Sequence, residues 1–357
     1  MKVLLAMSGG VDSSVAGALL QADGHDVVGV TLKLWGGASD SGCCSVSDVD
    51  DARRVAQQLG IDHLVFNFAD DFQAHVVDPY VGDHAAGTTP NPCVECNRHV
   101  KFDRLYRRAE QLGFDAVATG HHARVGRTPT GIYTLERGAD TAKDQSYVVH
   151  MLRQADLART LFPVGAIDKA EVRRIAAELG LRTAAKPDSQ DVCFITSTGG
   201  RETFLGERIE FRPGRVLDTT GNEVGQVPAV ELVTIGQRRG TGLPGGGPKR
   251  YVVDVDVAAA TVVVGPEAAL LDAAIGVTGV TWTDAALADG TAVRVQCSAH
   301  GRSQPAVWQH GSVIWQTPQR RVAPGQSVVL YDESDQRVLG GGTATRAATA
   351  AAAGHGD

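Results

Sequence analysis

Apolar and polar positions follow two different rhythms along this chain. In the first 180 residues, short apolar runs typical of buried strands alternate with longer stretches of helical spacing. The strand-like runs cover residues 2–7, 63–67 and 116–119, and the helix-like stretches cover 48–59, 97–112 and 170–179. Each of these helical stretches ends in Leu-Gly, where glycine supplies the left-handed position that closes a helix. The alternation predicts an α/β domain with a mainly parallel sheet and a ligand site at the carboxyl ends of its strands.

Beyond residue 205 the rhythm changes to short β-branched runs separated by glycine and proline. Strand-like runs are expected at 230–235, 250–257, 292–297, 312–316 and 327–331. We therefore predict an α/β domain over 1–205, a small linking domain over 206–275 and a C-terminal β-barrel over 276–345. The alanine-rich tail at 346–357 has no core-facing pattern, and we expect it to be disordered.

The first strand leads directly into a glycine turn and a helix. Ser8, Gly9 and Gly10 break the apolar run, and Asp12 and Ser13 are placed to cap the helix that follows. Such a helix start directs backbone N–H groups and the positive end of the helix dipole at an anion. The spacing fits neither a Walker A loop nor a dinucleotide-binding fingerprint. S-G-G-V-D-S instead resembles the PP-loop of ATP pyrophosphatases, which implies ATP binding and pyrophosphate release; the alternative is a turn that merely joins strand and helix.

Composition narrows the class of protein. Hydrophobic residues make up 43% of the 357 residues and charged residues 21%, which is ordinary for a globular chain. No apolar run approaches the roughly 18 residues of a membrane span, and the N-terminus shows no signal peptide, so we expect a cytoplasmic protein with no membrane partner. The net charge of −7 argues against a general nucleic-acid coat protein but permits a local basic patch.

Cysteine usage points to chemistry, because cytoplasmic thiols stay reduced and six are present. Cys96 comes just before the helix expected at 97–112, a position that lowers a thiol pKa, and Cys193 lies in a polar loop. Cys93, Cys96 and Cys193 are enough to hold an iron–sulfur cluster. A four-thiolate zinc site would need the adjacent pair Cys43 and Cys44, which chelates poorly.

Two further groups of polar residues have competing interpretations. Lys101, Arg104 and Arg108 share one face of the helix at 97–112, either as a solvated face or as a phosphate contact. His121 and His122 follow the strand at 116–119. Adjacent side chains point in different directions, so we do not expect a shared metal and we expect at least one of the two on the surface.

Taken together, the motifs resemble the bacterial tRNA-specific 2-thiouridylase family over nearly the whole chain. The matching stretches are A-M-S-G-G-V-D-S at 6–13, T-P-N-P-x-x-x-C-N at 89–97, A-T-G-H-H-A-R at 118–124, K-D-Q-S-Y at 143–147, S-Q-D-V-C-F-I at 189–195, T-I-G-Q-R-R-G at 234–240, and P-G-Q-S-V-V-L-Y with L-G-G-G within 324–342. Their order and spacing make the resemblance specific.

The resemblance implies a reaction and a set of site residues. ATP, with Mg²⁺, adenylates the 2-oxygen of the wobble uridine of tRNA; a persulfide on Cys193 then delivers sulfur, and Cys96 closes a disulfide with Cys193. The implied ATP contacts are Ala6, Met7, Ser8, Gly9, Gly10, Val11, Asp12, Ser13, Leu32 and Gly120. The implied target-base contacts are Asn91, Pro92 and Cys93, and the implied tRNA contacts are His121, Lys143, Asp144, Gln145 and Gln326. The implied partners are tRNA and a cysteine desulfurase or sulfur-relay protein that supplies the persulfide.

The chain departs from the family pattern at two places, and two rival functions stay open. Cys93 stands where some members carry Asp, and Gln296-Cys297-Ser298 stands where some carry R-Y-R; we expect Cys297 in the barrel core. One rival is another PP-loop enzyme, an amide-forming ligase, which would need neither paired cysteines nor a tRNA surface. The other is a non-catalytic iron–sulfur or redox-sensing RNA-binding module, which would not release pyrophosphate.

Overall fold

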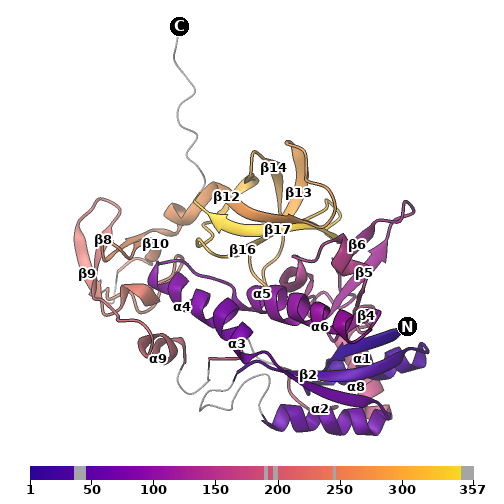
Figure 1. The fold of residues 1–357 in the computed structure, drawn as a ribbon. Helices are drawn as coiled ribbons and strands as arrows, with labels where there is room; N and C mark the ends of the chain where they lie inside the picture. The colour runs from indigo at the N-terminus through magenta and orange to yellow at the C-terminus, as the bar shows by residue number, and fades with distance from the viewer. Residues whose placement is uncertain (36–45, 189–191, 196–199, 244–246, 347–357) are drawn as a thin grey trace.

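The computed structural model describes residues 1–35, 46–188, 192–195, 200–243 and 247–346 in three units, shown in Figure 1. A parallel α/β unit comes first, a small four-stranded sheet follows, and an antiparallel barrel completes the chain. The α/β unit followed by a barrel confirms the predicted fold class. Cys43, Cys44 and almost all of the tail expected to be disordered lie outside the described residues.

The first unit contains a five-stranded parallel sheet in the order β3-β2-β1-β4-β7. The strands are β1 (Lys2–Ala6), β2 (Asp26–Lys33), β3 (Asp62–Asn67), β4 (Ala116–Thr119) and β7 (Thr160–Leu161). One face packs on helices α1 (Val11–Ala22), α2 (Val46–Leu59) and α8 (Lys169–Glu178) through aliphatic side chains. The other face packs on the helical segments between residues 69 and 111, whose buried residues include Phe72, Tyr80, Phe102 and Tyr106. The central strands β1 and β4 are buried on both faces and read as continuous apolar runs, whereas the edge strand β3 is partly exposed.

The helix predicted at 97–112 begins earlier than expected. Asn91 is the N-cap, and α5 (Pro92–Glu95), a π-helical segment η2 (Cys96–Arg104) and α6 (Leu105–Gln111) follow one another without a break. The Asn91 side chain accepts from the backbone N–H groups of Cys93 and Val94, at 3.2 and 3.3 Å. Proline at the first helical position is favourable, and this is what the sequence interpretation missed. The predicted Leu-Gly endings are confirmed, with positive φ at Gly60, Gly113 and Gly180.

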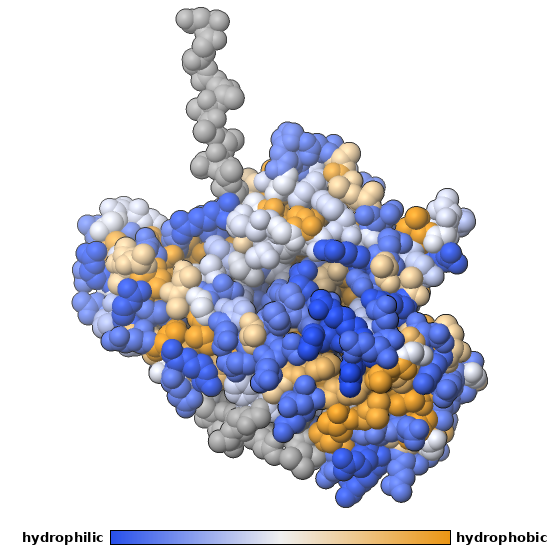
Figure 2. All heavy atoms as spheres, in the orientation of Figure 1, coloured by the Kyte–Doolittle hydropathy of each residue, from blue (hydrophilic) through white to orange (hydrophobic). Residues whose placement is uncertain are grey.

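The first unit contains further helical segments. They are α3 (Ala69–Phe72), the π-helical η1 (Gln73–Val77), α4 (Asp78–Ala85), η3 (Ser146–Val149), α7 (Gln154–Leu157) and α9 (Gly200–Gly206). None of the helices in the described part of the chain combines the length and apolarity needed to span a lipid bilayer. Figure 2 shows apolar residues gathered near β2 and β3, where Val65 is 44% exposed.

The middle unit is a four-stranded sheet in the order β10-β11-β8-β9. Its strands are β8 (Gly214–Asp218), β9 (Glu223–Val227), β10 (Tyr251–Asp256) and β11 (Thr261–Gly265). The strand expected at 230–235 is wrong, because Val230–Leu232 forms a short 3-10 turn, η4. There Glu231 is buried and accepts from the backbone N–H and the guanidinium of Arg212, so an ion pair fixes the segment in place of a strand ladder.

The third unit is a closed six-stranded barrel. Its strands are β12 (Leu271–Trp282), β13 (Thr291–Gln296), β14 (Gln304–Gln309), β15 (Ser312–Arg320), β16 (Ser327–Tyr331) and β17 (Arg337–Thr345), which follow the turn η5 (Glu267–Leu270). The β12–β17 pairing closes it. A hairpin from the first unit, β5 (Ala123–Arg127) and β6 (Tyr133–Arg137), extends the barrel sheet by pairing with β17. This pairing across about 200 residues ties the barrel to the α/β unit.

Candidate active site

The loop at Ser8–Ser13 joins the carboxyl end of β1 to α1. The helix N-cap is Gly10 and no side chain caps it, so the capping role expected for Asp12 and Ser13 is wrong. Ser13 Oγ instead donates to Gly10 O at 3.1 Å and accepts from Ser8 N–H at 3.3 Å, which holds the loop closed on itself. A side chain at Gly9 would meet Asp48 O at 2.5 Å, so the backbone there fits glycine alone.

The residues implied as ATP contacts gather at this edge of the sheet. Ala6 ends β1 and lies in register with Val30 on β2 and Thr119 on β4. Gly120 directly follows β4 and lies so close to the loop that a Cβ on it would be 2.6 Å from Ser13 N. Met7 and Val11 are buried on either side of the loop, and Leu32 is buried near the end of β2. The arrangement is the one expected for a ligand at the carboxyl ends of parallel strands.

Asp12 is held in the loop by two partners. The Lys169 ammonium donates to its two carboxylate oxygens at 2.6 and 2.7 Å, and His122 Nε2 lies 3.1 Å from Oδ1. Burial acts to raise the pKa of Asp12, but the hydrogen bonds from His122 and Lys169 lower it below its usual value. Asp12 is therefore a carboxylate at neutral pH.

Asp188 collects three cations beside the loop. Its carboxylate lies 2.7 Å from Lys143 Nζ, 3.0 Å from Lys169 Nζ and 2.8 Å from Arg173 Nη2. Burial acts to raise the pKa of Asp188, but the hydrogen bonds from Lys143 and Lys169 lower it to about 2. The three cations and the loop form a candidate anion-binding site, in which a phosphate group would replace Asp12 or Asp188 as a partner of these cations.

The sequence analysis names Lys143, as an implied tRNA contact, and misses the other cations near the loop. Lys169 and Arg173 come from α8, and Lys186 donates to Gly9 O at 2.9 Å and to the carboxylates of Asp48 and Asp51. They are more than 150 residues from the loop, so no local motif connects them to it. The available signal was topological: α8 packs beside α1, and the chain after it returns to the same edge.

Cys96 does not lie at a helix start, which corrects the sequence expectation. It is buried in the second turn of the helix that Asn91 caps, and Pro92 occupies the first position. A thiol there gains less from the helix dipole than one in the first turn. Cys93, the second residue of this helix, is half-buried.

Cys193 packs against the same hydrophobic core that contains Cys96. Its neighbour Phe194 is buried, and the Phe194 ring meets those of Phe72, Tyr80 and Phe204 at centroid distances of 5.6, 5.4 and 5.1 Å. Phe194 thereby anchors the short segment at 192–195. Within the described ranges no three Cys, His, Asp or Glu side chains are gathered closely enough to hold a metal ion.

The residues implied as tRNA contacts lie in different environments. Lys143 is half exposed and paired with Asp188, whereas the Asp144 carboxylate is buried and accepts from Arg137, Gly138 N–H and Ser146. Gln145 exchanges two hydrogen bonds with the backbone of His122. Gln326 donates from its side-chain amide to Thr89 O at 2.7 Å and so links the barrel to the loop before Asn91.

Both histidines after β4 are buried, so the expectation of a surface histidine is wrong. His121 Nδ1 lies 2.7 Å from Thr119 Oγ1, and burial, with the nearby Lys101 charge, lowers the pKa of His121 to about 3. Its imidazole is neutral at physiological pH. An RNA contact through this ring would therefore not be an ion pair.

The basic face of the helix is partly occupied by the protein itself. Arg104 lies 3.0 Å from the Asp71 carboxylate and its guanidinium covers the Phe68 ring, while Arg108 covers Phe66. Arg104 thereby joins η2 to α3, and Arg108 joins α6 to β3. Both arginines thus have partners within the protein, which argues against a phosphate contact for two of the three cations.

A cavity of about 810 Å³ opens where the three units meet. The first unit contributes His75, Asp83, Asn91, Glu95 and His99, the middle unit contributes residues 233–235 and 255–258, and the barrel contributes 323–325, Ser327 and 343–346. The loop at 86–91 forms one wall, so of the residues implied as base contacts Asn91 lines this cavity, whereas Pro92 and Cys93 do not. Its volume is within the range of small-molecule sites and is sufficient for one nucleotide.

Comparison with known proteins matches the chain along nearly its whole length. A family model described as tRNA methyl transferase HUP domain matches residues 1–197, a PRC-barrel domain of the same name matches 202–266, and an aminomethyltransferase beta-barrel domain matches 274–344. The tRNA-specific 2-thiouridylase MnmA of Chloroflexus aurantiacus is 47% identical over 96% of this chain and 98% of its own length. That of Roseiflexus castenholzii is 45% identical over 97% and 99%. The chain belongs to the tRNA-specific 2-thiouridylase MnmA family.

Among solved structures, the U34-tRNA thiolase NcsA from Methanococcus maripaludis with its [4Fe-4S] cluster overlaps 58% of this chain and 62% of its own, with 18% identity and a TM-score of 0.35.

Gln296, which stands where some members of the 2-thiouridylase family carry arginine, has a structural role in this chain. The Gln296 side chain is buried and accepts from Arg137 Nη1 at 3.0 Å, and Arg137 also donates to Asp144 and Asp335. Cys297, as expected, packs on the barrel core, and burial raises its pKa to about 12.

Proposed function

We propose that this chain catalyses ATP-dependent 2-thiolation of the wobble uridine of tRNA. The observation that carries the proposal is the position of Asp188. It binds Lys169, which also binds Asp12 of the loop at Ser8–Ser13 (the nucleotide loop), and it precedes Cys193 by five residues. One short stretch of chain thus connects the groups suited to ATP with a thiol suited to carry sulfur. Full-length similarity to proteins named tRNA-specific 2-thiouridylases supports the same reaction.

In the first half-reaction the loop binds the phosphates of ATP. Backbone N–H groups from Gly9 to Ser13, the Ser13 hydroxyl and the Lys169 ammonium stabilise the negative charge of the leaving pyrophosphate. Mg²⁺, when bound, neutralises phosphate charge, and Asp12 is the carboxylate of the loop that could join its ligands by releasing Lys169. The uridine 2-oxygen attacks the α-phosphorus, which turns a poor leaving group into AMP.

In the second half-reaction the terminal sulfur of a persulfide on Cys193 forms a bond to C2 of the uridine, and AMP leaves with the former 2-oxygen. The Cys96 thiolate then attacks the Cys193 sulfur. The bond between the two sulfurs of the persulfide breaks, the tRNA keeps the outer sulfur as a 2-thio group, and a Cys96–Cys193 disulfide remains. A cytoplasmic thiol reductant returns the enzyme to its dithiol form.

The substrate and the sulfur source follow from this chemistry. A stacked wobble base cannot reach a thiol, so the uridine is extruded from its loop into the cavity that Asn91 lines, at the start of the helix that Pro92 and Cys93 continue. The persulfide comes from a cysteine desulfurase or a sulfur-relay protein in the cytoplasm, where thiols stay reduced. An iron–sulfur thiolase and an amide-forming ligase are not favoured, because relatives covering nearly the whole chain are named 2-thiouridylases.

Pyrophosphate release tests this function. The chain with ATP should release pyrophosphate when unmodified tRNA is added, and tRNA that already carries a 2-thio group should give little release. Release that is indifferent to tRNA but requires an amine acceptor would indicate an amide-forming ligase. A protein that binds tRNA without any release would be a binding module.

A further inference from the structure

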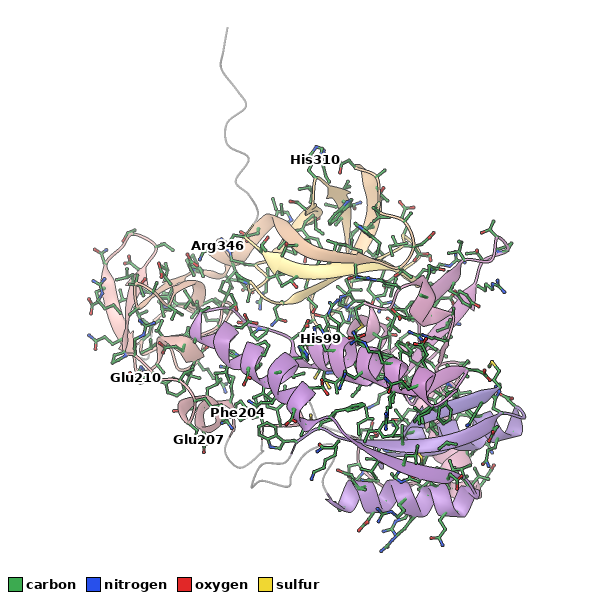
Figure 3. All side chains as sticks on the ribbon, in the orientation of Figure 1. His99, Phe204, Glu207, Glu210, His310 and Arg346 are labelled. Atoms are coloured by element: carbon green, nitrogen blue, oxygen red, sulfur yellow. The ribbon has the colours of Figure 1, made fainter. Side chains whose placement is uncertain are left out.

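Two histidines stack on each other at the wall of the cavity between the three units. The His75 and His99 rings have centroids 5.0 Å apart and planes inclined by 23°. Both residues line the cavity together with Asn91 and Glu95. Figure 3 shows His99 on the central helix, facing the space below the barrel.

Local backbone geometry presents both rings to this space. His75 lies in the π-helical η1 and His99 in the π-helical η2, which pack against each other. A π-helical turn is rare and occurs frequently at functional sites, because it re-aims side chains that a regular α-helix would point elsewhere. Here two such turns bring their histidines face to face.

The stack is not part of the hydrophobic core. His75 is exposed and the His99 side chain is 36% exposed, so ring surface remains open to the cavity. Glu95 Oε2 lies 3.2 Å from His99 Nε2 and fixes the orientation of that ring. Burial lowers the pKa of His99, so its ring is uncharged at neutral pH and stacks without repelling a neighbour.

Open aromatic ring surface beside an RNA site recognises one class of ligand. Single-stranded loops are bound by stacking their unpaired bases on aromatic side chains, histidine included. Glu95 pairs with Arg98 at 3.5 Å as well as with His99, so this guanidinium is engaged within the protein, and Asp83 adds a carboxylate to the same cavity lining. The ring faces therefore suit a base better than a phosphate.

We propose that His75 and His99 form a stacking platform for a nucleobase next to the target uridine. The inference rests on the proposed function, which makes the RNA loop the occupant of the cavity. His99 follows Cys96 by one helical turn and Asn91 caps the same helix, so the platform lies within reach of a nucleotide flanking the target. Stacking tolerates any base, so the platform adds affinity and orientation rather than sequence selection.

The test measures binding of the full chain to an unmodified anticodon stem-loop RNA. His75→Ala and His99→Ala should each weaken binding by roughly 5- to 30-fold with an unchanged salt slope, because stacking releases no counterions. His99→Phe should bind nearly as well as the wild type. His310→Ala is the matched control, since His310 lies at the far tip of the barrel in Figure 3 and pairs with Asp289; it should have no effect.

An abasic nucleotide on either side of the target identifies the stacked base. At one of the two positions, the abasic RNA should bind the wild type as weakly as the intact RNA binds His99→Ala. With that abasic RNA, His99→Ala should bind no more weakly than the wild type. Histidine variants that bind like the wild type, or that keep their full defect on both abasic RNAs, would overturn the platform. If His99→Ala fails to fold, His75→Ala carries the same comparison from an exposed site. Wild-type protein that neither binds nor thiolates the intact RNA would refute the proposed function itself.

Discussion

The Lys169 ammonium donates to both carboxylate oxygens of Asp12, at 2.6 and 2.7 Å, and so joins helix α8 to the nucleotide loop. The same ammonium lies 3.0 Å from Asp188, on the segment that leads to Cys193. A single cation therefore contacts the loop expected to bind phosphate and the segment expected to carry sulfur. If a phosphate group replaced one of these carboxylates on Lys169, the contacts of both the loop and the segment leading to Cys193 would change.

The first prediction concerns this cation. Lys169→Ala removes a charged donor from the phosphate site, which costs about 1.5–3 kcal/mol, so the KM for ATP should rise roughly 10- to 100-fold. Arg174→Ala is the control on the same helix, because Arg174 is exposed and pairs with Glu171 and Glu178 at the surface. Equal KM values for the two variants would remove Lys169 from the ATP site.

Ser13 provides a second prediction. Ser13→Ala should slow tRNA-dependent pyrophosphate release roughly 10- to 100-fold, because a hydrogen bond to a charged phosphate is lost while the fold remains. Ser14→Ala is matched: Ser14 also donates to Gly10 O, but its hydroxyl faces Thr183 at 3.0 Å. If both variants slow release alike, the effect comes from loop stability and the phosphate contact is refuted.

Asp188 makes stability depend on pH in a defined window. Its pKa is lowered to about 2, so its contribution is present above the unfolded value near 4 and is lost as pH falls toward 2. The difference in unfolding free energy between the wild type and Asp188→Asn should be constant above about pH 4 and shrink below it. Urea titrations at pH 6, 4 and 3 measure this. A difference that does not change between pH 4 and pH 3 would contradict the ion cluster.

The basic face of the η2–α6 helix gives a prediction that separates two roles. Arg104→Glu places a carboxylate beside Asp71, so it should lower the unfolding free energy by about 1 kcal/mol and leave the salt slope of tRNA binding unchanged. Arg107→Glu, on the exposed side of the same helix, is the control. A salt slope lower by about 1 in Arg104→Glu alone would instead show a phosphate contact.

The two thiols should fail at different steps. Cys193→Ser should not accept labelled persulfide from a cysteine desulfurase, and Cys96→Ser should accept it but form no thiolated tRNA. Both should still release pyrophosphate, because neither thiol belongs to the nucleotide loop. Cys297→Ser, in the barrel core, should retain activity. Label kept by Cys193→Ser and lost by Cys96→Ser would reverse the assignment.

Local patterns predicted the elements that local energetics determine. The strands at 116–119 and 327–331 have the predicted bounds, and the three Leu-Gly helix endings are correct, because burial and a left-handed glycine act within a few residues. The predicted strand at 230–235 is wrong, because the conformation of this segment depends on the ion pair between Glu231 and Arg212. The site shows the same difference between local and non-local features. The loop at Ser8–Ser13 could be predicted from its local sequence. The contacts of Lys169 and Arg173 with Asp188 and the stacking of His75 on His99 join separate elements, so no local pattern predicts them.

The central claim is that this chain converts the wobble uridine of tRNA to 2-thiouridine. The most direct measurement incubates the full chain with unmodified tRNA, ATP and a persulfide donor, and then identifies the nucleosides by chromatography and mass spectrometry. The account predicts 2-thiouridine at the wobble position, with one AMP and one pyrophosphate formed for each thiolated base, and none when ATP is omitted. ATP cleavage without 2-thiouridine, thiolation at another position, or a methylated nucleoside in its place would contradict it.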